Sequence, residues 1–409
     1  MEPRENGPRR TRDLLWFMTA VLLPLPWIVA HNLAGLGLSP EVTAVLAGVA
    51  ILGSAFLLSW ATELAESDIP QSLALLVLAL VSVLPEYAVD LHFAWRAGSD
   101  PTYAPYAVAN MTGGNRLLIG LGWPLVGVIA CMRSRATHLE VDPRQRLEIR
   151  FLLIATLYSF VIPFRDHITL VDAAALLGLF LAYVVFAMRS SSQEVELIGP
   201  AALLETLFSE NGRRLWALAM FAFATYGILV SAEPFADGLV HVGRNYGIDE
   251  FLLVQWLAPL ASESPEFVIA VLFALKGRGT LGIGALVSSK VNQWTLLVGA
   301  IPIAYSISSG TLRGIPLDAR QVEELWLTSA QSLLATVLIA DLRFGTREGV
   351  LLAVLFLAQL FFPSTHVRYF FIGTYLALSF LFLALGARAR RSAFAALLRP
   401  SAGGQPVSE

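Results

Sequence analysis

The sequence predicts an all-α polytopic membrane protein with about twelve transmembrane helices. Hydrophobic residues fill 56% of the 409 positions and charged residues only 14%, whereas soluble proteins carry about 25% charged residues. Apolar runs long enough to cross a bilayer recur along the whole chain and are separated by short loops. Two of these runs are copies of each other. The duplication predicts two inverted five-helix repeats, with one extra helix at each end of the chain.

The predicted spans lie where apolar runs of roughly 15 to 25 residues occur. The eleventh run is the shortest of the set. The twelve spans are 14–36, 41–65, 69–96, 103–131, 148–164, 168–188, 214–235, 249–275, 280–307, 324–341, 348–363 and 367–387.

The basic residues test this arrangement, because cytoplasmic loops carry an excess of Lys and Arg. Alternation of the twelve spans places 20 basic residues on the side of both termini and 6 on the opposite side. We therefore expect an integral protein of the cell (plasma) membrane with both termini in the cytoplasm. The N-terminus is basic and then apolar but lacks a convincing cleavage site, so we interpret it as a retained first helix.

The two copies begin five spans apart, and an odd number of spans turns the second copy upside down relative to the first. The middle of the segment between them is amphipathic, which is compatible with an interfacial helix or with a solvated tether. The expected organisation is an N-terminus and extra helix over 1–40, a first repeat over 41–188, a cytoplasmic linker over 189–213, a second repeat over 214–363, and an extra helix and cytoplasmic tail over 364–409.

Each repeat contains a Pro-Glu pair inside an apolar run, Pro85-Glu86 in the first and Pro265-Glu266 in the second. The segments LVSVLPEYAVDLHFAWR and LASESPEFVIAVLFALK match at Leu, Ser, Pro, Glu, Phe and Ala. A carboxylate at membrane depth is costly and indicates a functional site, and the proline frees carbonyl oxygens beside it. Oxygen-rich sites suit hard cations such as Na⁺ and Ca²⁺. The alternative is a structural kink whose Glu pairs with a basic side chain.

A span rich in small residues follows each Pro-Glu run, AVANMTGGNRLLIGLG from Ala107 and GIGALVSSKVNQWTLLVG from Gly282. Small residues allow close helix packing, which accounts for Gly113 and Gly284. Packing does not account for the amide and hydroxyl side chains that these spans also contain. They are Asn110, Thr112, Asn115, Ser288, Ser289, Asn292 and Gln293.

The combination of S-x-x-P-E on one helix and a G-S-N-x-x-N-like motif on the next, repeated in inverted halves, resembles the calcium/cation antiporter superfamily. That superfamily includes the sodium/calcium and proton/calcium exchangers. The resemblance implies cation transport without a cofactor, and it implies that Glu86 and Glu266 coordinate the transported metal ion. By position it also implies a set of supporting ligands, which are Ser82, Ser262, Asn115, Ser289 and Gln293.

The chain departs from the family pattern at several motif positions. In the first repeat, Gly114 replaces the motif Ser and Leu118 replaces the final Asn. In the second repeat, Lys290 replaces the middle Asn, and Glu263 stands where a hydroxyl is usual. The two halves are therefore not equivalent, and the predicted site loses neutral oxygens while it gains charges.

We hypothesise that Lys290, with Arg116 as a second candidate, occupies a place where a relative binds a cation. A tethered ammonium would replace a co-bound Na⁺ and favour coupling to protons. The alternative is that both basic side chains snorkel or form structural pairs. Asp90 lies one turn beyond Glu86 and is either a further acid or a partner of Arg116. His92 is a candidate proton relay or an interfacial side chain.

The leading function is a secondary antiporter that moves Na⁺ or Ca²⁺ against H⁺ or Na⁺ by alternating access. Na⁺/H⁺, Ca²⁺/H⁺ and Na⁺/Ca²⁺ exchange are all compatible with the residues. The alternative function is a non-transporting scaffold or sensor whose site is closed by its own salt bridges.

Other function classes lack the necessary motifs. The chain has no H-E-x-x-H or G-x-S-x-G motif, so we do not expect an enzyme, and it has no nucleotide-binding motif for an ATP-driven pump. Its basic residues are spread among loops, which argues against a nucleic-acid partner. Cys131 is the single cysteine and cannot form an internal disulfide. The expected partners are the lipid bilayer and inorganic cations, and the sequence indicates no protein partner.

Overall fold

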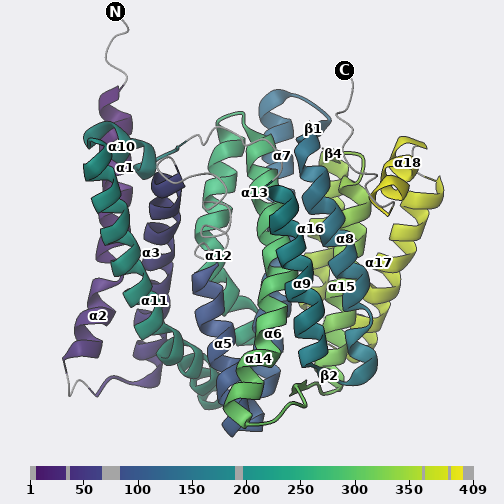
Figure 1. Ribbon diagram of the computed structural model, residues 1–409, viewed down its shortest axis with the longest axis horizontal. Helices are drawn as coiled ribbons and strands as arrows, with labels where there is room; N and C mark the ends of the chain where they lie inside the picture. The colour runs from purple at the N-terminus through teal and green to yellow at the C-terminus, as the bar shows by residue number, and fades with distance from the viewer. Residues whose placement is uncertain are drawn as a thin grey trace, which may run out of the picture. The chain divides into compact units, whose positions relative to one another are not determined.

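The protein is built almost entirely from helices in the part of the chain that the computed structural model describes (Figure 1). Each predicted span coincides with helix over most of its described residues, so the all-helical fold class is confirmed. The third span is described only from residue 83 onward, and the predicted ligand Ser82 lies outside the described residues. The described residues are 6–33, 37–66, 83–188, 197–361, 364–385 and 388–398.

The helices follow one another with short connections. Those up to the linker are α1 (Asn6–Leu22), α2 (Leu25–Asn32), α3 (Pro40–Glu66), α5 (Leu84–Ser99), η1 (Pro101–Tyr103), α6 (Ala104–Leu117), η2 (Leu118–Gly122), α7 (Trp123–Ser134), η3 (Pro143–Gln145), α8 (Arg146–Ser159), η4 (Ile162–Arg165), α9 (Leu170–Ala187) and α10 (Pro200–Leu207). Those that follow are α11 (Glu210–Tyr246), α12 (Glu250–Leu275), α13 (Gly279–Asn292), η5 (Gln293–Leu297), α14 (Val298–Ser309), α15 (Ala319–Ile339), α16 (Thr346–Phe361), α17 (Thr365–Leu385) and α18 (Arg388–Leu397).

Eight stretches of the described helices are long and apolar enough to cross a membrane. The predicted spans at 280–307, 324–341 and 348–363 are not among these eight stretches, because the helices there are more polar or shorter. The eight stretches are Arg10–Asn32, Pro40–Ala65, Pro101–Ser134, Pro143–Arg165, Leu170–Ala187, Glu210–Tyr246, Glu250–Leu275 and Thr365–Leu385.

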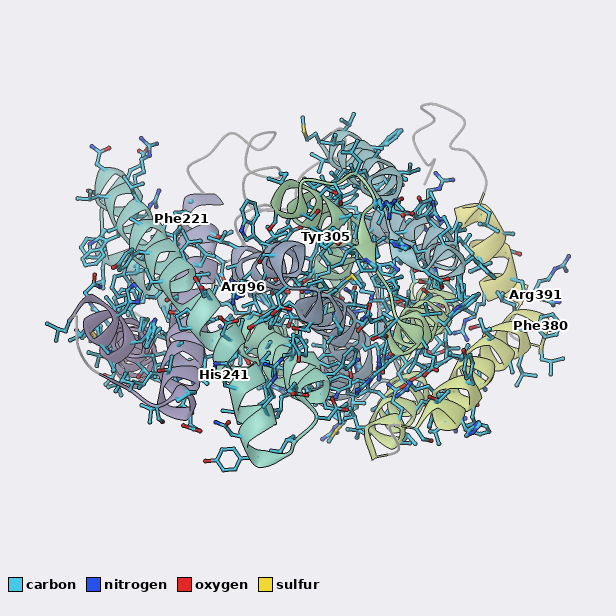
Figure 2. All side chains as sticks on the ribbon, turned by 90° about the horizontal axis from the view of Figure 1, so that it is seen from below. Arg96, Phe221, His241, Tyr305, Phe380 and Arg391 are labelled. Carbon is cyan, nitrogen blue, oxygen red and sulfur yellow. The ribbon has the colours of Figure 1, made fainter. Side chains whose placement is uncertain are left out.

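Large apolar side chains are exposed on several of these helices, as expected of surfaces that face lipid. Phe380 of α17, for example, is 73% exposed and projects from the ribbon (Figure 2). Val171 of α9 and Leu218 of α11 are similarly exposed. Together with the eight apolar stretches, these surfaces indicate an integral membrane protein.

Two short antiparallel strand pairs connect helix ends. β1 (His138–Glu140) pairs with β4 (Arg343–Gly345), and β2 (His167–Ile168) pairs with β3 (Ile315–Pro316). The helices α9 and α15 follow β2 and β3, and each begins with a capping box in which side chain and backbone satisfy each other's hydrogen bonds. The residues are Thr169 with Asp172, and Asp318 with Gln321.

The helices form two compact units, and the first comprises Met1–Gly114, His167–Val268 and Leu296–Pro316. In this unit the 37-residue helix α11 packs along α3, while α14 packs against both α5 and α9. Small residues bring α11 and α3 together, because a Cβ added at Gly227 would lie 2.3 Å from the hydroxyl oxygen of Ser54. The linker helix α10 packs on α1 and α3 and buries Leu203 and Leu204, so this part of the linker is not a solvated tether.

The second unit comprises Asn115–Asp166, Ile269–Thr295 and Leu317–Glu409. Its most buried helix is α15, which packs against α8 and α17. Around it, α16 packs on α7, and α13 contacts both α7 and α8. This unit therefore combines helices from both predicted repeats with α17, which lies outside them.

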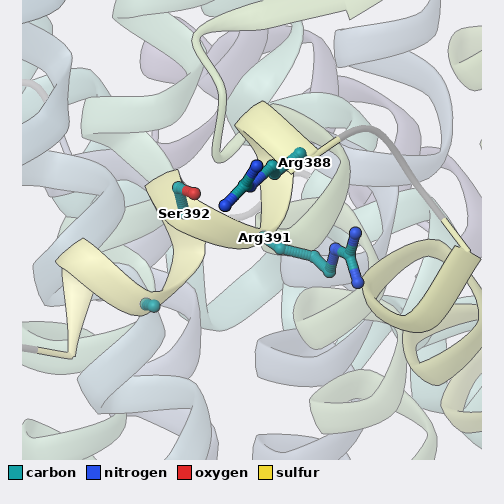
Figure 3. Close-up of a pocket in the computed structure, with 4 residues that line it drawn as sticks. Arg388, Arg391 and Ser392 are labelled. Atoms are coloured by element: carbon teal, nitrogen blue, oxygen red, sulfur yellow. The ribbon is translucent and has the colours of Figure 1, made fainter.

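The short helix α18 is fixed to the second unit by polar contacts. Arg390 forms ion pairs with Asp341 and Glu348, and the Arg150 guanidinium donates to the carbonyl of Leu397 at 2.9 Å. Arg388, Arg391 and Ser392 of the same helix line an open hollow, and both arginines are exposed (Figure 3).

Two segments of π-helix interrupt the small-residue spans at equivalent places. The first, η2, begins three residues after Asn115, and the second, η5, begins three residues after Lys290. Asn115 and Lys290 occupy the same position of the duplicated motif, so the two π segments begin in the same register. Such segments are rare and often occur at functional sites.

Candidate functional site

The two Pro-Glu pairs take different places in their helices. Pro85 is the second residue of α5, where its missing N–H costs no helical hydrogen bond, and Glu86 lies in the first turn. A carboxylate there also interacts favourably with the positive end of the helix dipole. Pro265 instead lies inside the continuous helix α12. The sequence predicted a mid-span proline in both copies, and the described residues show this only for Pro265.

Three carboxylates form an acidic cluster in the first unit. Glu86 and Glu263 are buried and Glu266 is half-buried, and Glu86 interacts electrostatically with both of the others. The structure therefore brings together the three acids that the sequence singled out. No group of three or more His, Cys, Asp or Glu among the described residues is arranged closely enough to hold a metal ion by itself. A cation at this cluster requires further oxygen ligands.

The polar neighbours of the cluster come from α5, α6 and α12. The Ser262 hydroxyl donates to the carbonyl of Ala258 at 3.2 Å, on its own helix. Asp90 is fully buried on α5, with the Asn110 amide as its polar neighbour. It also contributes to the electrostatic environment of Glu86, which fits its predicted role as a further acid.

His92 lies farther along α5 and has an acidic partner that the sequence did not indicate. Its Nε2 lies 3.3 Å from Oδ1 of Asp237 on α11. Arg96 and Tyr103 lie near Asp237, and Glu233 adds a negative charge near Arg96. His92 is thus part of a polar group at the end of α5 rather than a lone interfacial side chain.

The second unit contains the other predicted site residues. Gln293 begins η5, and the others lie on two helices that we call the motif helices: α6, which contains Asn115, and α13, which contains Lys290. Lys290 is fully buried, and its ammonium donates to both oxygens of Asn115, to Oδ1 at 2.7 Å and to the main-chain carbonyl at 3.1 Å. The Trp294 ring lies 4.4 Å from the same ammonium, a distance typical of cation–π contacts. The two equivalent motif positions therefore contact each other directly.

The ammonium of Lys290 occupies the kind of environment that a bound cation would have. Two oxygens and an aromatic face surround it, and one oxygen is a main-chain carbonyl at the entrance to η2. A π-helix shifts the hydrogen-bonding register, so carbonyls at its entrance accept bonds from other groups. The next carbonyl, that of Arg116, accepts from the Gln331 amide at 3.2 Å.

Arg116 pairs with a glutamate that the sequence interpretation left out. Its guanidinium donates to Oε2 of Glu324 on α15. Arg368 of α17 lies on the other side of this carboxylate, 4.0 Å from its Oε1, and pairs with Glu323 at 2.6 Å. All four side chains are buried, with exposures between 3% and 8%. We call these four residues, Arg116, Glu323, Glu324 and Arg368, the charge network.

The charge network bears on Arg116, for which the sequence left two interpretations open. The ion pair with Glu324 favours the structural pair over the fixed cation for this residue. Arg368 lies inside α17 and is also in a buried ion pair. Hydropathy indicates neither pair, because it does not show which buried charges meet.

Two predicted ligands on α13 and η5 have no protein partner in the described part of the chain. Neither the Ser289 hydroxyl nor either amide atom of Gln293 forms a hydrogen bond there, although both side chains are buried. Buried polar groups of proteins are ordinarily satisfied. Their arrangement fits oxygen ligands for a cation.

Sequence reasoning missed Glu323, Glu324, Arg368 and Gln331. The available signal was the pair of adjacent glutamates in ARQVEELW, which lies at the edge of a predicted span. Acidic residues inside membrane spans indicate functional sites. This argument selected Glu86, and it applies equally to Glu323 and Glu324.

The sequence of this chain is similar to those of known cation exchangers. The family described as "Sodium/calcium exchanger protein" matches residues 38–189 and 216–365. A proposed antiporter of Alkalimonas amylolytica, CaxA, is 22% identical over 292 residues, which cover 70% of this chain and 86% of that protein.

Solved structures of cation exchangers share the fold. The crystal structure of an H⁺/Ca²⁺ exchanger, CAX, is 44% identical with a TM-score of 0.87, over 95% of this chain and 98% of that chain. The sodium-calcium exchanger NCX_Mj is 18% identical with a TM-score of 0.54, over 80% of this chain and 99% of that chain. The second likeness concerns the fold alone.

Proposed function

The chain belongs to the sodium/calcium exchanger protein family of secondary cation transporters, and from this premise we propose that it exchanges Ca²⁺ for H⁺ across a membrane. The acidic cluster of Glu86, Glu263 and Glu266 carries this proposal. Carboxylates suit a hard divalent cation, and they also accept protons when the cation leaves. The 44% identity to an H⁺/Ca²⁺ exchanger favours this pair of ions over the Na⁺-coupled alternatives.

The proposed cation ligands are Glu86 and Glu266, and Glu263 contributes a third carboxylate. Ser82, Ser262, Asn115, Ser289 and Gln293 are the proposed supporting ligands. The buried hydroxyl of Ser289 and amide of Gln293, which form no hydrogen bond with any described residue, support this assignment.

The exchange proceeds by alternating access in a chain of twelve spans, with two inverted repeats over 41–188 and 214–363. The matching register of η2 and η5 supports the duplication. The segment 1–40 precedes the first repeat and the segment 364–409 follows the second, and each contains one extra helix. The cytoplasmic linker 189–213 joins the two repeats. Both termini lie in the cytoplasm of a cell whose plasma membrane holds the protein, as the 20 basic residues on that side favour.

Lys290 takes the place of one cation. Its ammonium is held by two oxygens of Asn115 and by the Trp294 ring, which together resemble the surroundings of an ion rather than those of a snorkelling side chain. A fixed positive charge at a motif position leaves room for fewer mobile cations. Exchange therefore needs no Na⁺, and protons provide the counter-transport.

The test is ion flux into liposomes that contain the full-length protein. We expect an imposed pH gradient to drive ⁴⁵Ca²⁺ uptake, and we expect Glu86→Gln and Glu266→Gln to abolish it. Glu140→Gln is the matched control, because Glu140 is exposed on β1 and far less enclosed than the cluster. Absence of gradient-driven ⁴⁵Ca²⁺ and ²²Na⁺ flux in the wild type would favour the non-transporting scaffold or sensor.

A further inference from the structure

The charge network is the most concentrated set of buried ion pairs in the described part of the second unit. Two arginines and two glutamates carry equal and opposite formal charges there, and three helices contribute them: α6, α15 and α17. Removing water from four charges is expensive, and buried ion pairs are weak contributors to stability compared with apolar packing. The network is therefore better explained by a need to hold particular residues in place than by a gain in stability.

What the network positions is the end of α6. Glu324 holds the Arg116 side chain, and Gln331, two turns farther along the same helix α15, holds the Arg116 carbonyl at 3.2 Å. Arg116 is thus fixed at its side chain and at its main chain by one helix. The residue before it is Asn115, whose two oxygens hold the ammonium of Lys290.

The helix α17 adds a second layer to this support. Arg368 pairs with Glu323 and lies 4.0 Å from Oε1 of Glu324, so it places a second positive charge beside the carboxylate that holds Arg116. Tyr375, which is fully buried about two turns beyond Arg368 on α17, also lies close enough to interact electrostatically with Arg116. The family match ends at residue 365, where α17 begins, so the residues that provide this support lie beyond the matched region.

We propose that Glu324, backed by Arg368, is a positioning residue for cation exchange. It acts through Arg116 to hold Asn115 and Lys290 in the orientation that cation binding requires. The proposal rests on the proposed function, since it concerns the affinity of the same exchanger for its cation. It assigns to α17 a role in transport.

The experiment compares Ca²⁺ uptake kinetics of full-length variants in liposomes, with ⁴⁵Ca²⁺ as the probe. We expect Glu324→Gln to raise the KM for Ca²⁺ by about 10- to 100-fold, the range found when residues behind metal ligands are replaced. Arg368→Gln is expected to act in the same direction, and Glu324→Asp to recover part of the affinity. Glu348→Gln is the matched control, because it removes a carboxylate from another ion pair of the second unit, the one with Arg390, and we expect it to leave the KM unchanged.

A paired substitution separates position from folding. Arg116→Gln with Glu324→Gln removes one charge of each sign, so the network stays balanced and we expect more folded protein than from Glu324→Gln alone. The KM for Ca²⁺ is nevertheless expected to stay high, because Asn115 loses its support. A KM within about twofold of the wild type in the folded paired variant, beside a functioning wild type, overturns the positioning role. A wild type that moves no cation overturns the proposed function instead, and the positioning role with it.

Discussion

The two motif helices, α6 and α13, share a backbone plan and differ in their side chains. Both end two residues after the same motif position and continue into a π segment, η2 or η5. At that position α6 has Asn115 and α13 has Lys290, and the two side chains bind each other. The residue after it is the buried Arg116 in one helix and the apolar Val291 in the other.

The two helices therefore share their backbone geometry while their side chains have different chemistry. One copy supplies oxygens and the other supplies a fixed charge, so together they form one complete contact. Neither half could form this contact with a copy of itself, because two asparagines lack the charge and two lysines repel each other. The following predictions test the division of roles, beginning with the largest expected effect.

Replacement of the fixed charge should have the largest effect on stability. Lys290→Met leaves the two buried oxygens of Asn115 without this donor, and an unsatisfied buried group costs about 1–3 kcal/mol. We expect a clear fall in the thermal unfolding temperature in detergent, measured by size-exclusion chromatography after heating. Lys290→Arg keeps the charge and should lose less. Equal unfolding temperatures for Lys290→Met and the wild type would show that the contact between the motif helices is dispensable.

The packing of the two motif helices should respond unequally to the same substitution. A Cβ added at Gly113 of α6 would lie 1.8 Å from the main-chain oxygen of Gln255, whereas one at Gly284 of α13 meets the flexible end of Gln145 at 2.9 Å. Gly113→Ala is therefore expected to destabilise the protein by about 1–3 kcal/mol in total, within the range of typical overpacking, whereas Lys290→Met leaves two separate oxygens without a donor. Gly284→Ala should cost less, since Gln145 can move away.

Gly178→Ala is the control for these two variants, because a Cβ there meets nothing within 4 Å. Thermal unfolding of the three purified variants makes the comparison. Equal losses at Gly113 and Gly284 would mean that the two motif helices are packed alike, contrary to the structure.

The hydrogen bond to the main-chain carbonyl of Arg116, just before η2, should contribute to the stability of the protein. Gln331→Leu removes the amide that bonds to the Arg116 carbonyl, and we expect a loss of about 1–3 kcal/mol in unfolding free energy. The control is Gln359→Leu on α16, because the buried Gln359 amide has no hydrogen-bond partner among the described residues. That substitution should be neutral or stabilising. A larger loss at Gln359 than at Gln331 would contradict this assignment.

The smallest expected loss of stability concerns the capping boxes of α9 and α15. Both helices begin with the same kind of cap. Thr169→Ala and Asp318→Ala each remove a capping acceptor, at a typical cost of about 1 kcal/mol. We expect similar decreases in unfolding temperature for both variants. A marked difference between them would show that the symmetry of the backbone does not extend to helix ends.

Much of the fold was predictable, because apolar periodicity and length directly reflect the bilayer. The acidic cluster was predictable too, since Glu86 and Glu266 occur in an obvious internal repeat. The partners of Arg116 and Lys290 were not, because each contact joins helices far apart in the sequence, and a buried charge gives no sign of which opposite charge it meets. The π segments were equally hidden, since no local residue pattern in LIGLG or QWTLL distinguishes them from α-helix.

The place of Lys290 in the ion cycle is tested most directly by Lys290→Asn, which restores the family residue at this position. The measurement is ⁴⁵Ca²⁺ uptake into liposomes under a pH gradient, a Na⁺ gradient or both. We expect the wild type to respond to the pH gradient alone. The variant should gain uptake driven by Na⁺ and show a changed pH dependence, because the position of the ammonium becomes available to a mobile cation. Ion selectivity and pH dependence identical to those of the wild type would contradict the assignment of Lys290 as a fixed cation.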